Sequence, residues 1–251
     1  MATLYDRTDI YDLFENVEKF QAVKKHWVKV LEGKEIQSLL DVSIGTGSLT
    51  LPVAELGISL YGSDLNGEML AKCKQKADWH RVPINLRECD FRKLTEKFEE
   101  TFDCVSSTGN SLPHVPNEDL EKTLEQMDRL VKKGGYLYYD MRNWDKILEE
   151  HNRFHLYEPM FTGDTRVNLV QLWDYCADGS MEFHLLYAFE KNGRIVQKEV
   201  FDERYYPISR EKVIRKIQEL GYRKIQVMCH PAYFEQVPPE RADWYCVMAQ
   251  K

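Results

Sequence analysis

Hydrophobic and polar positions follow two different periods in the first part of the chain. Residues 13–31 carry apolar side chains at three- and four-residue spacing, with Lys and Glu between them, which predicts an amphipathic helix. Short β-rich runs then occur at 38–42, 59–63, 84–89, 102–107 and 136–140. Helical spacing returns between them, as in 49–57 and 117–131. This alternation predicts βαβ units and a mainly parallel, doubly wound α/β sheet.

The pattern changes after about residue 145. Segments 167–175, 181–191 and 194–206 alternate with period two and are separated by hairpin signals at 177–180 and 192–193, which predicts an antiparallel sheet of about three strands. Ser209 then caps a predicted helix over 210–220. Two further strands, at 224–229 and 244–249, close the chain.

No linker rich in Pro, Gly or Ser separates the two parts, so we expect the antiparallel sheet to be an insertion. Residues 1–145 are predicted to form a Rossmann-like core with an N-terminal helix, and residues 146–207 the insertion. Residues 208–251 return to the core and complete a seven-stranded sheet. The antiparallel β insertion therefore lies between strand five and the last helix.

Composition narrows the class of protein. The 251 residues are 43% hydrophobic and 30% charged, as in ordinary globular proteins, and the net charge of −7 predicts no field that would collect nucleic acid. The N-terminus lacks the pattern of a signal peptide, and no 18 consecutive apolar residues occur. The six cysteines form no CxxC pair or zinc-binding spacing, which predicts reduced thiols, a cytoplasmic protein and no metal site.

Three features at successive strand ends indicate a nucleoside site. The turn at 41–47 contains Gly45 and Gly47, where the backbone can turn tightly and approach a ligand. Asp64 ends the second strand, where a carboxylate can accept hydrogen bonds from both ribose hydroxyls. Asp90 ends the third, within reach of an adenine amine, with Phe91 and Leu65 to enclose the ring. Each feature alone is equally explained as a structural turn or a helix cap; their order favours a nucleoside.

The phosphate-binding signals are missing. The turn lacks the third glycine of a dinucleotide fingerprint, and no G-x-x-x-x-G-K-[ST] loop occurs. The D-x-x-x-G-T-G turn resembles motif I of the Rossmann-like S-adenosylmethionine-dependent methyltransferases. The resemblance implies S-adenosyl-L-methionine as cofactor, with Asp41 and the glycines beside its methionine part, Asp64 on the ribose, and Asp90 with Phe91 on adenine. Further expected cofactor contacts are Ser43, where many members have glycine, Thr46, Leu65 and Thr108.

Two more segments narrow the resemblance. Residues 109–114 (GNSLPH) and 140–145 (DMRNWD) are similar to segments of glycine N-methyltransferases and glycine/sarcosine methyltransferases. The resemblance implies that Asn110 and Arg142 hold an amino-acid substrate. It also implies that tyrosines of the insertion line the pocket: Tyr187 and one of Tyr205 and Tyr206, of which we take Tyr206.

The chemistry agrees with this resemblance. A guanidinium at a strand end suits a carboxylate, although Arg142 could instead pair with Asp140 or Asp145. Methyl transfer needs mainly alignment, which fits the absence of a catalytic triad. His114 either takes the amine proton or packs under the substrate.

The predicted function is that of a transferase, an S-adenosylmethionine-dependent N-methyltransferase. Its predicted substrate is a small carboxylate-bearing amine such as glycine or sarcosine. The alternatives are a methyltransferase of the same fold for another amino acid, an amino sugar or a secondary metabolite, and a nucleoside-binding module without catalysis. The sequence leaves the oligomeric state open. It also leaves open whether the helix over 13–31 packs on the sheet, covers the cofactor or meets another subunit.

Overall fold

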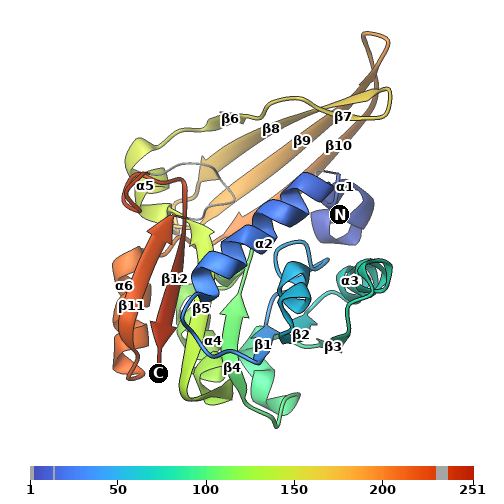
Figure 1. Cartoon of the computed structure of the whole chain (residues 1–251). Coiled ribbons are helices and arrows are strands. Elements are labelled where there is room, and N and C mark those ends of the chain that lie inside the picture. The colour runs from blue at the N-terminus through green and yellow to red at the C-terminus, as the bar shows by residue number, and fades with distance from the viewer. Residues whose placement is uncertain (1–2, 14, 230–236) are drawn as a thin grey trace.

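The computed structural model describes residues 3–13, 15–229 and 237–251, so Phe14 of the predicted first helix lies outside the described part. A seven-stranded sheet forms the core, in the order β11-β12-β5-β4-β1-β2-β3 (Figure 1). Its strands are β1 (Ser38–Asp41), β2 (Ser59–Asp64), β3 (Ile84–Glu88), β4 (Phe102–Ser107), β5 (Val131–Arg142), β11 (Arg223–Cys229) and β12 (Trp244–Gln250). Strand β12 runs antiparallel to both neighbours and the remaining pairs are parallel. The predicted mainly parallel, seven-stranded sheet is confirmed.

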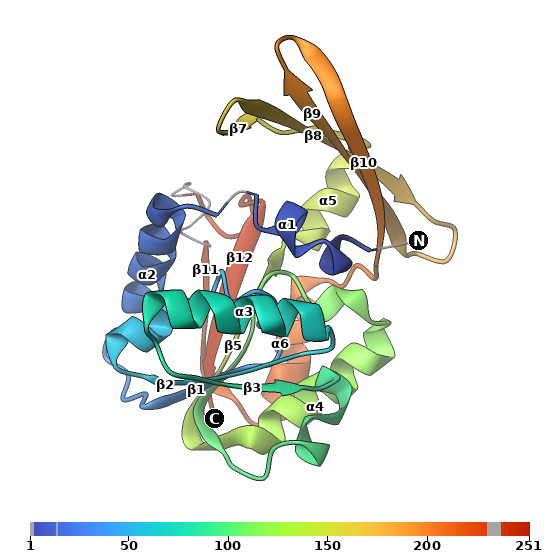
Figure 2. The same cartoon turned by 90° about the vertical axis from the view of Figure 1, so that its right-hand side faces the viewer.

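Helices cover both faces of this sheet (Figures 1 and 2). One face carries α2 (Val17–Leu31), η2 (Leu51–Leu56) and α3 (Gly67–His80), and the other carries η3 (Phe91–Glu96), α4 (Asn117–Leu130) and α6 (Arg210–Glu219). Successive residues of β5 alternate between the two cores: Tyr138 packs against Trp27 of α2, with ring centroids 4.7 Å apart, while Leu137 and Tyr139 face the α4 side. Both faces are buried at the centre of the sheet, where β1 and β4 carry mostly buried residues, whereas the edge strands β3 and β11 keep several exposed ones.

Two predicted helices differ from the structure. Helix α2 begins at Val17, because the side chain of Asn16 accepts the backbone N–H of Lys19 and caps it. The residues before it form two short turns, η1 (Leu4–Asp6) and α1 (Thr8–Tyr11). The segment after the glycine turn is the 3₁₀ helix η2, because only six residues, including Pro52, fit before Gly57 ends it in a left-handed conformation.

The insertion is a separate five-stranded antiparallel sheet above the carboxyl ends of the core strands (Figures 1 and 2). Its strands are β6 (Phe154–Leu156), β7 (Met160–Thr162), β8 (Thr165–Tyr175), β9 (Met181–Lys191) and β10 (Arg194–Tyr205). The three long strands match the predicted ones, whereas β6 and β7 have three residues each, too few to show a period. The sheet follows α5 (Trp144–Glu150) and is followed by α6, with η4 (Leu112–His114) below it.

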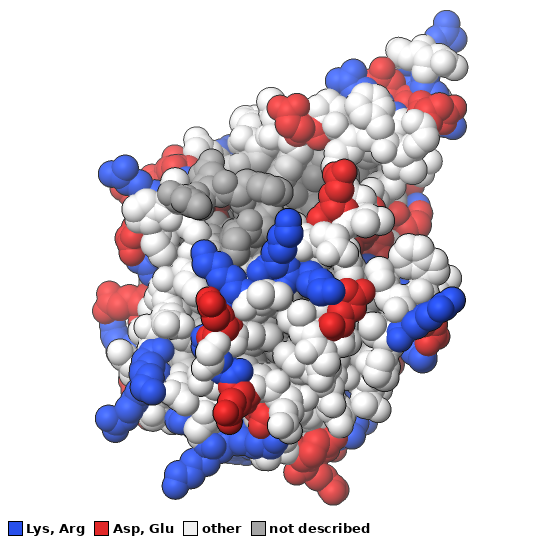
Figure 3. All heavy atoms as spheres, viewed as in Figure 1, with Lys and Arg blue, Asp and Glu red and all other residues white. Residues whose placement is uncertain are grey.

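Charges of both signs are mixed on the face shown in Figure 3. Helix α2 contributes two lysines that pair with acidic neighbours: Lys19 with Glu15 at 2.8 Å and Lys24 with Glu55 at 2.7 Å. Among the helices of the described part, none is long and apolar enough to span a membrane.

Candidate active site

Two cavities adjoin each other between the core sheet and the insertion. The first, of about 550 Å³, lies over the carboxyl ends of β1, β2 and β3. The second, of about 1250 Å³, lies beneath the insertion sheet and above the end of β5. Tyr5, Tyr11 and Gly109 line both cavities. A ligand in each cavity would therefore meet the other at these residues.

The two glycines of the first turn have different surroundings. Both have positive φ, 53° at Gly45 and 83° at Gly47. A Cβ built on Gly45 meets only the Tyr11 hydroxyl, at 3.9 Å, and both residues line the first cavity. A Cβ on Gly47 would lie 2.6 Å from Leu51 Cγ and 2.8 Å from Cys73 Sγ. Gly45 therefore leaves room for a ligand, whereas Gly47 leaves room for packing below the turn.

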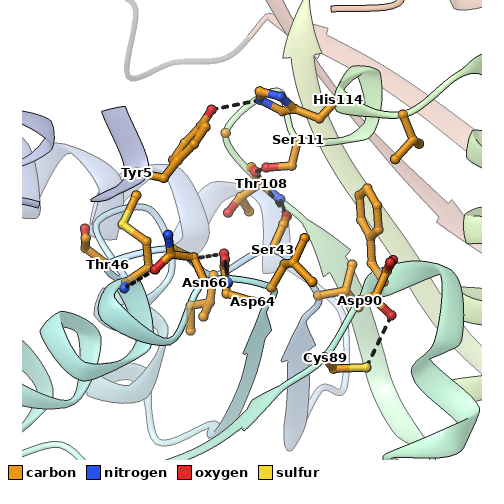
Figure 4. A pocket seen from close by; sticks show the side chains of 18 of the residues that line it. Tyr5, Ser43, Thr46, Asp64, Asn66, Cys89, Asp90, Thr108, Ser111 and His114 are labelled. Atoms are coloured by element: carbon orange, nitrogen blue, oxygen red, sulfur yellow. Dashed lines mark hydrogen bonds between the residues drawn. The ribbon is translucent and has the colours of Figure 1, made fainter. Parts of the chain in front are cut away.

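Asp64 and Asp90 end neighbouring strands and both face the first cavity (Figure 4). Asp64 accepts the backbone N–H groups of Gly45 and Asn66, both at 2.9 Å, and burial raises its pKa. The hydrogen-bonded Arg92 guanidinium lowers the pKa of Asp90, whose carboxylate it contacts at 2.6 Å. Leu65 and Phe91 line the same cavity, so the predicted ribose and adenine residues are brought together.

Ser43, Thr46 and Thr108 also line the first cavity, but Asp41 does not. Asp41 is fully buried beneath the turn, where it accepts hydrogen bonds from the hydroxyls of Thr50 and Thr108. Burial raises its pKa to about 6. Asp41 therefore supports the cavity wall from beneath, and its expected contact with the cofactor stays a prediction.

Arg142 reaches the second cavity from the end of β5. Its guanidinium carbon lies 5.2 Å from the ring centroids of both Trp173 and Trp244. Neither alternative partner is paired with it: Asp140 accepts the N–H of Gly109 and Asp145 accepts that of Arg210. Within residues 3–13, 15–229 and 237–251, no carboxylate forms an ion pair with this guanidinium. Its donors therefore remain available to a carboxylate from outside the chain.

Asn110 lies beside Arg142 and is only 2% exposed. Its Oδ1 accepts the backbone N–H of Arg142 at 3.0 Å and the indole N–H of Trp144 at 3.2 Å. Its Nδ2 is buried and has no hydrogen-bond partner among the described residues. A buried amide without a partner is costly, and Asn110 itself lines the second cavity.

The tyrosines of the insertion divide between the cavities. Tyr187 and Tyr205 line the second cavity, whereas Tyr206 lines the first and hydrogen-bonds through its backbone N–H to Pro113. Of the two adjacent tyrosines, Tyr205 rather than Tyr206 shares the second cavity with Tyr187, and the role of Tyr206 toward the substrate stays a prediction. Neighbouring residues of an extended chain point to opposite sides, so a choice between two adjacent tyrosines depends on register, which the sequence left open.

Tyr5 and Tyr11 were missed, because the N-terminal segment shows no motif and reaches the site only through tertiary contacts. The Tyr5 hydroxyl is 2.8 Å from Nε2 of His114, above the first cavity (Figure 4). Burial lowers the pKa of His114 to about 4, and its ring packs on Tyr205 with centroids 4.5 Å apart. These contacts favour the packing alternative for His114 over a role as proton acceptor.

Comparisons with known proteins agree with this geometry. Residues 39–135 match a family described as a methyltransferase domain. One relative is the glycine/sarcosine N-methyltransferase of Aphanothece halophytica, which is 28% identical in sequence. The aligned region covers 90% of this chain and 80% of that protein.

Two solved structures share the fold. One is an S-adenosylmethionine-dependent methyltransferase from Clostridium acetobutylicum, with a TM-score of 0.76 at 14% identity, covering 97% of this chain and 96% of that one. The other is an amino pentose methyltransferase from Micromonospora echinaspora, with a TM-score of 0.72 at 14% identity. The match covers 100% of this chain and 97% of that one. Each of the two solved structures therefore shares the fold of this chain over nearly its whole length.

Proposed function

Because this chain is a class I S-adenosylmethionine-dependent methyltransferase, we propose that it methylates the nitrogen of a small amine that carries a carboxylate, with glycine and sarcosine as the first candidates. One observation carries the proposal: among the described residues the Arg142 guanidinium has no carboxylate partner, and Arg142 and Asn110 both line a cavity that adjoins the first cavity at Gly109. Arginine offers a planar fork of donors that matches a carboxylate. The relative from Aphanothece halophytica, by its name, acts on glycine and sarcosine, which supports this substrate class.

The residues of the first cavity fit the cofactor. In this proposal the Asp64 carboxylate would accept the ribose hydroxyls, and Asp90 with Phe91 would hold adenine, since all three line the first cavity. Gly45 leaves the wall open where a Cβ would intrude. The remaining wall residues proposed to contact the cofactor are Ser43, Thr46, Leu65 and Thr108. When bound, the cofactor supplies a methyl group already activated by its sulfonium.

The chain's own task is then to align the amine. Arg142 and Asn110 would hold the carboxylate, which directs the nitrogen toward the junction of the cavities at Tyr5 and Gly109. Holding two reactants in such a geometry removes much of the entropic cost of their meeting. Tyr187 lines the same cavity, and its protonated hydroxyl would orient the amine through a hydrogen bond.

Arg142→Ala tests the carboxylate clamp. Losing a charged hydrogen-bonding partner costs about 1.5–3 kcal/mol, so KM for glycine should rise about 10- to 100-fold, with KM for S-adenosylmethionine nearly unchanged. Methylamine, which lacks the carboxylate, should be methylated equally by both proteins. Arg166→Ala is the matched control, because Arg166 lies on the insertion, pairs with Glu190 and lines neither cavity.

A panel of candidate substrates tests the main alternative, in which the methyl acceptor is an amino sugar. Glycine, sarcosine, dimethylglycine, methylamine and an amino sugar are compared by the rate at which each forms S-adenosylhomocysteine. A preference for the amino sugar, or kinetics with glycine that Arg142→Ala leaves unchanged, would contradict the carboxylate clamp. The amino pentose methyltransferase that shares this fold makes the amino sugar a necessary arm of the panel.

A further inference from the structure

Asp140 lies two residues before Arg142 on β5, yet it lines neither cavity and is 1% exposed. Its Oδ1 accepts the backbone N–H of Gly109 at 2.9 Å and the indole N–H of Trp244 at 3.0 Å. The backbone N–H of Asn110 also hydrogen-bonds to this carboxylate. One buried side chain thus holds both the loop that follows β4 and the first residue of β12.

The first contact fixes Asn110. This residue has a φ of 61°, a conformation that residues with a Cβ seldom adopt without support. The hydrogen bonds from Gly109 and Asn110 to Asp140 hold the main chain in that conformation. In this conformation Asn110 lines the second cavity.

The second contact fixes the surroundings of Arg142. Trp244 pairs with Arg142 across the β5–β12 ladder, and its ring lies 5.2 Å from the guanidinium carbon. The indole N–H donates to Asp140 at 3.0 Å, and because hydrogen bonds are directional this contact restrains the ring against which the guanidinium packs. The position of the Arg142 fork therefore depends on Asp140 through Trp244.

We propose that Asp140 is a positioning residue for methyl transfer: it aligns the two substrate-holding groups at once, Asn110 through the main chain of its loop and Arg142 through the indole of Trp244. The assignment rests on the proposed function, in which these two groups hold the carboxylate of the amine. Asp41 acts on the same loop from the cofactor side, since it holds the hydroxyl of Thr108 at 2.7 Å. Two buried carboxylates thus support the loop that follows β4: Asp41 holds Thr108, on the cofactor side, and Asp140 holds Gly109 and Asn110, on the substrate side.

Asp140→Asn and Asp140→Ala test this assignment, with Asp41→Asn as the matched buried-carboxylate control. Burial raises the pKa of Asp140 to about 7, so assays at pH 8.5 keep it ionised. Charged hydrogen bonds are roughly twice as strong as neutral ones, so Asp140→Asn should raise KM for glycine about tenfold, and Asp140→Ala more. KM for S-adenosylmethionine should change less than about twofold in Asp140→Asn. Asp41→Asn should show the reverse pattern.

A second readout does not depend on turnover. Acetate is titrated into the protein loaded with S-adenosylhomocysteine, and tryptophan fluorescence reports binding because Trp173 and Trp244 flank Arg142. Asp140→Asn should weaken acetate binding by a factor similar to its effect on KM for glycine. Trp244→Phe removes the indole N–H while keeping a ring, and should raise KM for glycine in the same direction. If Asp140→Ala does not fold, Trp244→Phe still tests whether the link from Asp140 to Arg142 matters.

The double variant Asp140→Asn/Arg142→Ala separates positioning from a general loss of stability. If Asp140 acts through Arg142, the increase in KM for the double variant is smaller than the product of the two single increases. Unchanged glycine and acetate binding in both Asp140 variants, with Arg142→Ala impaired, would overturn the assignment and leave the proposed function standing. Unchanged kinetics in Arg142→Ala would overturn the proposed function, and the assignment with it.

Discussion

Alanine substitutions at Gly45 and Gly47 should separate a glycine that leaves room for a ligand from one that leaves room for protein. Both residues have positive φ, so either alanine strains the backbone by about 1–2 kcal/mol. A Cβ at Gly47 would also press on Leu51 and Cys73, from which it would lie 2.6 and 2.8 Å. Overpacking of this kind costs a further ~1–3 kcal/mol.

We therefore expect Gly47→Ala to have the larger effect on stability and Gly45→Ala to have the larger effect on ligand binding. Gly47→Ala should lower the free energy of unfolding by about 2–5 kcal/mol and Gly45→Ala by about 1–2 kcal/mol. Affinity for S-adenosylhomocysteine should follow the opposite order. The Cβ of Gly45→Ala enters the first cavity opposite Tyr11, whereas Gly47 does not line it.

Urea denaturation without cofactor measures the free energy of unfolding. Calorimetric titration measures the affinity for S-adenosylhomocysteine. The double variant Gly47→Ala/Leu51→Ala is an internal check. Removing the Leu51 side chain relieves the clash. The double variant should therefore lose less stability than Gly47→Ala and Leu51→Ala lose when their separate effects are added. Equal losses for the two glycine variants, or weaker binding in Gly47→Ala than in Gly45→Ala, would refute the reasoning.

Two further predictions concern the aspartates. Asp64→Ala should weaken S-adenosylhomocysteine binding by at least ~100-fold, because two charge-assisted hydrogen bonds of about 1.5–3 kcal/mol each are lost; undiminished affinity in the titration would contradict the placement of the ribose. Burial raises the pKa of Asp140 to about 7 and that of Asp41 to about 6, above the ~3.9 of an unfolded aspartate. Between pH ~4 and ~7 the folded protein therefore binds more protons than the unfolded chain, so these groups make the free energy of unfolding fall as pH rises. Asp140→Asn should flatten that fall in urea denaturation from pH 5 to 8, and profiles parallel to the wild type would argue against it.

The sequence was sufficient for the main features of the fold. Strands with period two and helices with period 3.6 depend on which side of an element is buried, and the residues show this locally. The order of strands and helices was predicted for the same reason, and so was the cap at Ser209, which depends on a few neighbouring residues. Elements without a local period, such as β6 and β7, escaped prediction.

The candidate site was only partly predictable. Asp64, Asp90, Asn110 and Arg142 stand at strand ends, and the carboxyl ends of parallel strands meet at one edge of a sheet, so the sequence alone could place them together. Their roles toward cofactor and substrate stay predictions, which the variants above test.

The tertiary structure alone decided which residues complete the cavities. Tyr5 meets His114 from 109 positions away, Trp244 packs on Arg142 across the β5–β12 ladder, and Tyr205 rather than Tyr206 lines the second cavity. Asp41, which the resemblance places beside the cofactor, and Asp140, which the sequence offered only as a partner for Arg142, line neither cavity. Local pattern determines which face of an element is buried, but membership of a cavity depends on which distant elements meet there. No period or motif along one segment contains that information.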